Sequence, residues 1–214
     1  MSRFQSPNIR AYRWVVFLAA LFYFFYQFTQ TDLAKFGIQF RFLTIWGLTF
    51  NLVVAWLMLS QSLGRSTRDW NALVSATAVL GGIVVFMYWK LWFIDPALVN
   101  SGGPIVWYQE YYLHAAGPLL MWIDAFLILG AFRRIPQTLV LMLAIFVAYI
   151  LWIEFAVQPL NDAPAGSATS GLPYPFLNDM ETPARWTFYA TTIGTAVVFM
   201  GIGWVISRLL KVGR

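Results

Sequence analysis

The sequence predicts an all-α integral membrane protein, a bundle of six transmembrane helices with both termini in the cytoplasm. Sixty per cent of the 214 residues are hydrophobic and only 11% are charged, less than half the roughly 25% that is usual for soluble domains. Six apolar runs are long enough to cross a bilayer core of about 30 Å. Because lipid cannot satisfy open strand edges, and because the runs lack the alternation of barrel strands, each is predicted to be a helix. One transmembrane domain is expected over residues 1–214.

The six runs follow one another along the chain, with two long connections between them. The first run ends in bulky residues, where a signal peptide would need small ones, so it is predicted to be a retained anchor. The long connections run from Asp95 to Glu110 and from Gln158 to Ala184. The spans are predicted at Tyr12 to Phe28, Ile38 to Leu59, Ala72 to Ile94, Tyr111 to Ala131, Pro136 to Val157 and Arg185 to Leu209.

The basic residues indicate the orientation of the bundle. Ten of the fourteen Lys and Arg residues fall on the side that carries both termini, so the positive-inside bias predicts that this side faces the cytoplasm. The ten are split among four short segments rather than forming one footprint, and we therefore expect no nucleic-acid partner. The ten are Arg3, Arg10, Arg13, Arg65, Arg68, Arg133, Arg134, Arg208, Lys211 and Arg214, and the other four are Lys35, Arg41, Lys90 and Arg185.

The second long connection, residues 158–184, is rich in proline and glycine, which favours irregular backbone. Its second half, Leu172 to Leu177, is too aromatic for a simple solvated loop. One interpretation is a lid that folds back over the helix ends, where protein or a wet cavity satisfies its backbone. The other is an aromatic anchor at the membrane interface. Both interpretations place the loop on the external side.

The only histidine, His114, lies one turn into the fourth apolar run. An ionisable residue in hydrocarbon is costly and tends to mark a functional site; a structural histidine that bridges two helices is the alternative. Pro118 has no N–H for the carbonyl of His114, so that carbonyl needs another partner. Asp124 lies about 15 Å deeper, too far to orient the imidazole. It is predicted to be a buried group that bonds to another helix.

Depth along the helices brings further polar residues to the level of His114. At about 1.5 Å per residue, Thr44, His114, Glu154 and Lys90 lie about 4.5 to 7 Å below the external interface. Thr191, on the last helix, falls within the same outer third. The sequence therefore predicts a polar pocket that opens toward the outer leaflet.

Asn51 lies on the same helix stripe as Thr44, about two turns deeper. A polar stripe in a membrane helix normally faces its partner helices. Interhelical hydrogen bonds, worth about 0.6 kcal/mol each, are the alternative explanation for this stripe, and threonines also bond to their own helix backbone.

Four landmarks in register along the chain resemble those of a known family. They are similar to the androgen-induced gene family of multi-pass membrane proteins and to bacterial membrane proteins with the same landmarks, which indicates a bacterial inner membrane. The landmarks are Phe40-Arg41-Phe42-Leu43-Thr44-Ile45-Trp46, His114 with Pro118 and Asp124, Tyr149-Ile150-Leu151-Trp152, and Tyr174-Pro175-Phe176-Leu177 ahead of Ala184-Arg185.

The resemblance implies a chemistry. Animal members are threonine hydrolases that cleave fatty acid esters of hydroxy fatty acids, which implies Thr44 as nucleophile and His114 as general base. The substrate would be a lipid ester that enters laterally from the bilayer, and no cofactor or metal is expected. Asn51, Lys90, Asp124, Glu154 and Thr191 are the candidate supporting or substrate-binding residues. The imidazole could be oriented by Glu154, Tyr111 or a backbone carbonyl. The oxyanion of the transition state could be stabilised by Lys90, by Trp or Tyr donors, or by backbone amides.

Two other classes of protein stay open at this stage. A small transporter or proton-coupled channel would also place His114, Glu154 and Asp124 within the membrane. A single histidine could instead ligate haem, or join carboxylates around a metal. The chain contains no cysteine, which excludes disulfides, thiolate catalysis and zinc–thiolate sites.

Overall fold

The computed structural model describes residues 3–29, 31–99 and 106–212, and within them the fold consists of helices and their connections. Six helices there are long and apolar enough to span a membrane, which confirms the predicted all-α fold of six spans. Residues 100–105 of the first long connection, and Arg214 among the counted basic residues, lie outside the described residues. The spans are Pro7–Thr29, Leu43–Ser62, Asn71–Ile94, Trp107–Leu129, Ile135–Leu160 and Thr182–Leu210.

Helices α1 (Pro7–Thr29), α2 (Leu43–Ser62), α3 (Asn71–Ile94) and α8 (Thr182–Leu210) each form one span. Two spans are composite, because π-helical turns interrupt them. The fourth consists of α4 (Trp107–Tyr111), η4 (Tyr112–Ala116), α5 (Gly117–Ile123) and η5 (Asp124–Leu129), and the fifth of α6 (Ile135–Trp152), η6 (Ile153–Val157) and η7 (Gln158–Leu160).

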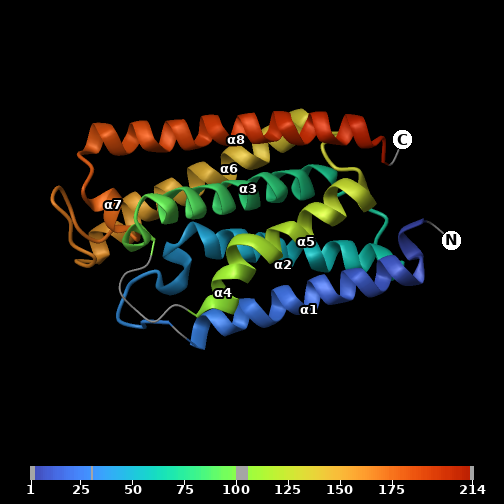
Figure 1. Cartoon of the computed structure of the whole chain (residues 1–214), viewed down its shortest axis with the longest axis horizontal. Helices are drawn as coiled ribbons and strands as arrows, with labels where there is room; N and C mark the ends of the chain where they lie inside the picture. Colours follow the sequence, from blue (N-terminus) through green and yellow to red (C-terminus); the bar gives the residue numbers. More distant parts are fainter. Residues whose placement is uncertain (1–2, 30, 100–105, 213–214) are drawn as a thin grey trace.

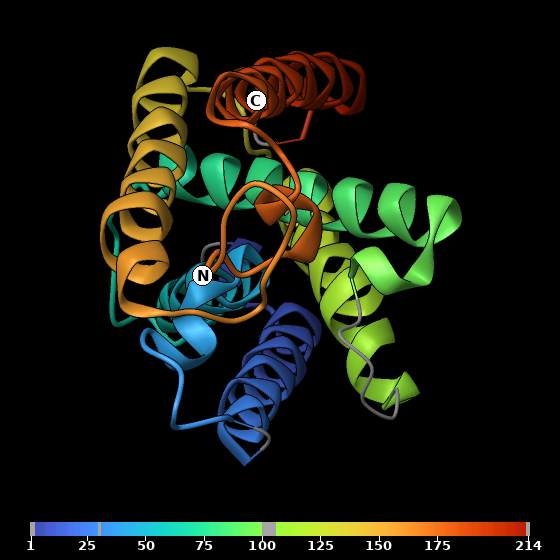
Figure 2. The same cartoon turned by 90° about the vertical axis from the view of Figure 1, so that its left-hand side faces the viewer.

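Helix α3 is the centre of the bundle. In its most apolar stretch 61% of the residues are buried, against 17% in α1 and α8, whose outer faces expose large apolar side chains as lipid-facing helices do. Both ends of the chain lie at one end of the bundle (Figure 1), as an even number of spans requires. The segment between the fifth and sixth spans lies across the opposite end (Figure 2). That opposite end is called the cavity end below.

Helix α2 begins five residues later than the predicted start of its span at Ile38. Residues Ile38–Arg41 form a short 3₁₀ turn, and Phe42 is extended. Two indole side chains hydrogen-bond to a carbonyl of this turn. Phe40 O accepts from Trp46 Nε1 at 2.8 Å and from Trp152 Nε1 at 3.1 Å. This turn is therefore not part of α2. The helix begins at Leu43, and Thr44 is its second residue.

A buried ion pair joins α1 to the fourth span near the end that carries the termini. Arg13, 1% exposed, donates from Nε and Nη2 to the two carboxylate oxygens of Asp124 at 2.7 and 2.8 Å. Its Nη1 donates to Met58 O and Ser62 Oγ of α2, at 2.8 and 2.9 Å. Asp124 is thus a buried group bonded to another helix, as predicted, and one guanidinium connects three spans.

Arg13→Ala is expected to destabilise the protein strongly, because it leaves the carboxylate of Asp124 buried without a partner. Removing one member of a buried pair costs about 3–5 kcal/mol. The measurement is the midpoint of thermal unfolding of the purified protein in detergent.

Arg134→Ala is the matched control. Arg134 pairs with Asp69 at 2.9 Å, but the two side chains are 51% and 40% exposed, and exposed pairs contribute about 0–1 kcal/mol. Equal unfolding midpoints for the two variants would contradict a structural role of the buried pair.

Candidate active site

A cavity of about 420 Å³ occupies the cavity end of the bundle. It is lined by the end of α1, the 3₁₀ turn before α2, the first turn of α2, the end of α3, α4, η4, α6, η6, α8 and the external loop. Thr44 and His114 both line it, as the shared depth in the sequence predicts. Most of the remaining lining is aromatic or aliphatic, which suits a lipid. The apolar and aromatic residues include Phe42, Leu43, Ile45, Val84, Met87, Tyr88, Leu91, Leu113, Phe146, Tyr149, Ile150, Ile153, Tyr174, Phe176, Leu177, Phe188, Tyr189 and Ile193.

The hydroxyl of Thr44 and the imidazole of His114 are hydrogen-bonded across the cavity, with 3.3 Å between Oγ1 and Nε2. On the other side of the ring, Nδ1 lies 3.2 Å from the backbone carbonyl of Glu110. A carbonyl can only accept, so Nδ1 carries the proton, and in a neutral ring Nε2 is the acceptor. Thr44 therefore donates to His114, which is the arrangement of a nucleophile and its general base.

Glu110 forms a chain of three polar groups with His114 and Thr44. Glu110 was not predicted in this position from the sequence. Its carboxylate Oε2 lies 3.2 Å from Nδ1 of His114, whose side chain is 7% exposed. A carboxylate at this nitrogen orients the imidazole and stabilises the imidazolium. The i, i+4 spacing of Glu110 and His114 on one helix was a signal for this contact.

The ring of His114 is held on its face as well as at its edges. Tyr88 stacks on it with 3.6 Å between ring centroids and 6° between planes. The carbonyl of His114, which Pro118 leaves without its helical donor, accepts from Trp89 Nε1 at 2.8 Å. The predicted need for another partner is thus met by α3, and His114 lies in a π-helical turn, a feature frequent at functional sites.

Tyr174, from the external loop, brings a hydroxyl to Thr44. Its oxygen accepts from the backbone N–H of Leu43 at 3.1 Å and also interacts with the backbone and side chain of Thr44. Burial raises the pKa of Tyr174 above its ordinary value, so the group stays protonated. The Tyr149 hydroxyl, which donates its own proton to Arg41 O at 3.0 Å, also interacts with that of Tyr174. Tyr174 therefore belongs to a hydroxyl network beside Thr44.

Two of the predicted supporting residues on α2 and α3 lie away from the cavity. Asn51 is buried and donates from Nδ2 to Gly117 O at 3.3 Å; it lines a separate cavity of about 20 Å³. Lys90 is exposed, with its ammonium 5.9 Å from the ring centre of Phe86. The rise per residue predicts how deep each residue lies in the membrane. The rotation of the helix about its axis decides which way its side chain points.

The two other predicted carboxylates are held in ion pairs. Asp124 is bonded to Arg13, as described above, far below the cavity. Glu154 accepts from Arg185 Nε at 2.7 Å and Nη2 at 3.2 Å, and from the Tyr189 hydroxyl at 2.6 Å. Glu154 therefore does not orient the imidazole, a position that Glu110 occupies.

On α8, the residue next to the predicted one reaches the cavity. Thr191 is exposed and bonds to Phe188 O of its own helix, whereas Thr192 lines the cavity. One residue along a helix is a rotation of about 100°. Among the described residues, no three His, Asp or Glu side chains are grouped so that they could hold a metal ion.

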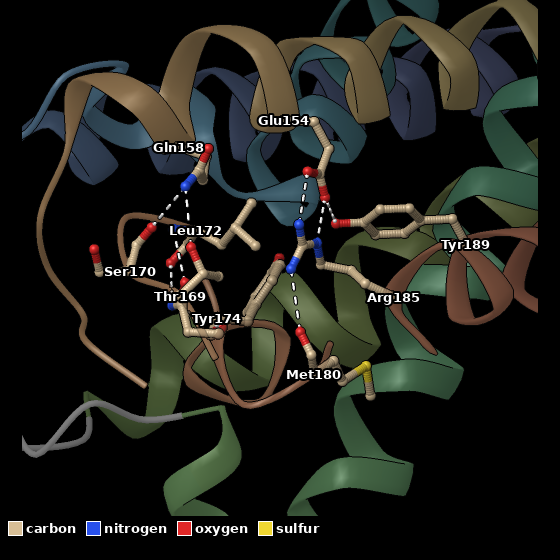
Figure 3. Close-up of polar contacts among 10 residues, drawn as sticks. Glu154, Gln158, Thr169, Ser170, Leu172, Tyr174, Met180, Arg185 and Tyr189 are labelled. Carbon is tan, nitrogen blue, oxygen red and sulfur yellow. Dashed lines mark hydrogen bonds and ion pairs between the residues drawn. The ribbon is translucent and has the colours of Figure 1, made fainter. Parts of the chain in front are cut away.

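The external loop packs over the cavity end (Figure 3). Leu172 and Leu177 are buried, and Tyr174, Phe176 and Leu177 line the cavity. Two polar ties hold the loop: Gln158 Nε2 donates to Thr169 Oγ1 at 3.1 Å and Ser170 O at 3.3 Å, and Arg185 Nη1 donates to Met180 O at 3.2 Å. The loop thus covers the Thr44–His114 pair, and its opening as a lid stays a prediction.

A family model described as FAR-17a/AIG1-like protein matches residues 9–208 of this chain. The match covers the four inner spans completely and all but two residues of each of the first and last spans. It agrees with the family that the sequence landmarks indicate. No curated protein and no solved structure matches the chain.

Arg185→Ala is expected to loosen the loop, because this guanidinium ties Glu154 of the fifth span to the carbonyl of Met180. Cleavage of the folded protein by chymotrypsin after Phe176 should become at least about fivefold faster, since local opening exposes this site. The measurement is the time course of cleavage in detergent.

Lys35→Ala serves as the control. Lys35 pairs with Asp162 of the same loop at 3.6 Å, but Asp162 is 97% exposed. This variant should be cleaved at the wild-type rate, and equal rates for all three proteins would show that Arg185 does not hold the loop.

Proposed function

The chain belongs to the FAR-17a/AIG1-like family, and from this premise we propose that it is a membrane-embedded hydrolase of fatty acid esters, with Thr44 as nucleophile and His114 as general base. The hydrogen bond between Thr44 Oγ1 and His114 Nε2 inside an apolar cavity is the observation that carries the proposal. A threonine hydroxyl is a weak nucleophile at its own pKa and needs an adjacent base.

The reaction has two halves. In the first, Nε2 of His114 takes the proton as Thr44 Oγ1 attacks the ester carbonyl, and then gives it to the leaving alcohol as the C–O bond breaks. An acyl-threonine remains. In the second half, His114 takes a proton from water, the resulting hydroxide equivalent attacks the acyl carbon, and the proton returns to Thr44 as the fatty acid leaves. The Glu110 carboxylate stabilises the imidazolium in both halves.

Tyr174 is the oxyanion donor in this proposal. Its hydroxyl accepts from Leu43 N–H and interacts with Tyr149 and Thr44, and rotation of its O–H bond can turn the proton to the oxygen that becomes negative when Thr44 attacks. The first turn of α2 adds the positive end of the helix dipole at the same place. Donors aimed at a developing charge in a site without water are among the largest contributions to catalysis.

The substrate enters from the bilayer, and the reactive pair faces the extracytoplasmic leaflet. The ten-to-four distribution of basic residues supports this orientation, because it assigns the end with the termini to the cytoplasm. We place the protein in a bacterial inner membrane as a multi-pass protein, with residues 158–184 as the lid over its site.

Transport is the weaker explanation of the polar residues within the spans. A proton path needs groups that are free to change their charge. Asp124 is bonded to Arg13, and Glu154 to Arg185 and Tyr189. These contacts favour structural roles for both carboxylates.

Thr44→Ala and His114→Ala are each expected to lower ester hydrolysis by about 10³-fold or more, because the two groups act as one unit. They should also abolish covalent labelling by a lipophilic fluorophosphonate. Thr191→Ala, an exposed threonine on α8, is the control and should keep both activities. Hydrolysis and labelling that survive in both Thr44→Ala and His114→Ala would exclude this mechanism.

Tyr174→Phe is expected to lower kcat by about 10²-fold with little change in KM, since an oxyanion donor acts mainly in the transition state. Tyr111 is an exposed tyrosine of α4. The Tyr111→Phe variant is therefore the control, and it should leave kcat and KM at their wild-type values. A change confined to KM would assign Tyr174 to substrate binding instead.

A further inference from the structure

Three glutamines form a second polar region in the wall of the mostly apolar cavity, beside the group of Thr44, His114 and Glu110. Gln27 comes from the end of α1, Gln39 from the 3₁₀ turn before α2, and Gln109 from α4, next to Glu110. Figure 2 shows α1 and α4 on one side of the bundle and α6 and α8 on the other. The glutamines thus come from one side of the bundle, whereas apolar lining residues such as Phe146 and Ile193 come from α6 and α8.

The glutamines are partly bonded to one another. Gln109 Nε2 donates to Gln27 Oε1 at 3.2 Å, and Gln39 Nε2 donates to the backbone carbonyl of Gln27 at 3.1 Å. Within the described part of the chain, this leaves Nε2 of Gln27 and Oε1 of Gln109 buried with no hydrogen-bond partner. Gln27 is only 3% exposed. Buried amide groups without partners are costly, by about 1–3 kcal/mol each, so they point to a ligand.

The unpaired atoms define the chemistry of that ligand. One is a donor and the other an acceptor, and exchanging the oxygen and nitrogen of both amides leaves the pair with one of each. A hydroxyl or a carboxamide satisfies both at once. A carboxylate, which only accepts, would leave the acceptor unpaired.

The charge of the cavity wall also disfavours an anion. Among the lining residues that the structure describes, Glu110 is the one with a full negative charge and none is Lys or Arg. The sequence has no Lys or Arg between Lys90 and Arg133. The nearby Arg41 stacks on the ring of Phe42 at 4.8 Å instead of lining the cavity. A ligand carboxylate would lose its water beside Glu110 without gaining a cation.

We propose that the glutamine region is a subsite for the alcohol portion of the substrate, and that the substrate is a neutral ester lipid whose alcohol portion carries a hydroxyl or amide group, such as a monoacylglycerol. This inference rests on the proposed hydrolase function. The acyl chain lies against the apolar residues of α6 and α8, the ester carbonyl at Thr44, and the hydroxyl between Gln27 and Gln109.

Three oleoyl esters test the subsite with the purified full-length protein in detergent: 1-monooleoylglycerol, propyl oleate, and the oleoyl ester of a hydroxy fatty acid with a free carboxylate. We expect kcat/KM for the glycerol ester to exceed each of the other two by about tenfold or more, because one hydrogen bond of about 1.4 kcal/mol corresponds to a factor of ten. Gln27→Leu and Gln109→Leu should each reduce the ratio between the glycerol and propyl esters to near one.

Gln137→Leu is the matched control, since Gln137 is exposed on α6, and it should keep the wild-type ratio. Either glutamine variant decides the question, so a failure of one to fold leaves the other. Hydrolysis with a ratio near one in the wild type, a preference for the free carboxylate, or ratios unchanged in both variants would overturn the subsite.

A binding measurement separates the subsite from the chemistry. The ether 1-O-octadecylglycerol cannot be hydrolysed, and it should raise the thermal unfolding midpoint of the wild type more than that of Gln27→Leu or Gln109→Leu. Stabilisation that depends on the glutamines, in a protein that hydrolyses none of the esters, would retain the subsite and refute the hydrolase. Equal stabilisation of all three proteins would refute the subsite.

Discussion

Polar groups within the spans of this protein must be satisfied by the protein itself, because hydrocarbon offers no hydrogen bonds. The architecture follows from where those partners are found. Arg13 meets Asp124 and the carbonyl of Met58, which fixes three spans near the termini. Arg185 meets Glu154 at the other end. In a low dielectric, separating the partners of an ion pair leaves a buried charge unpaired and destabilises the fold strongly. Each of these contacts therefore constrains the packing of the helices that carry it.

The same requirement builds the proposed catalytic arrangement. Pro118 removes the helical donor of the His114 carbonyl, and the indole of Trp89 replaces it, which joins the fourth span to α3 beside the imidazole. Indole donors from α2 and α6 hold the carbonyl of Phe40 outside α2. The start of α2 is thereby set at Leu43, and Thr44 comes to the first helical turn, facing His114. Local breaks in regular helix thus position both Thr44 and His114.

Of the buried polar atoms without a partner in the described part of the chain, the two in the cavity wall have a different meaning from the groups that are paired. Asp124 and Glu154, which looked like functional charges within the membrane, are fully engaged with arginines. The unpaired amide atoms of Gln27 and Gln109 lie instead in the cavity wall. A ligand that replaces the missing partners gains hydrogen bonds that water no longer supplies, and in an apolar site this discriminates strongly between substrates.

The number of spans, the presence of buried charge, and the common depth of Thr44 and His114 followed from the sequence, because apolar length, basic residues and rise per residue are properties of each segment alone. The sequence also indicated that the carbonyl of His114 would need a new partner. Depth, however, does not fix rotation: Lys90 and Thr191 share the level of the cavity but point away from it, while Thr192 points in. The contact of Glu110 with His114 was open to prediction from its i, i+4 spacing, but Tyr174 beside Thr44 and the glutamine region depend on how segments up to 131 residues apart meet. Only the packing of the helices, and the loop folded over their ends, decides those contacts.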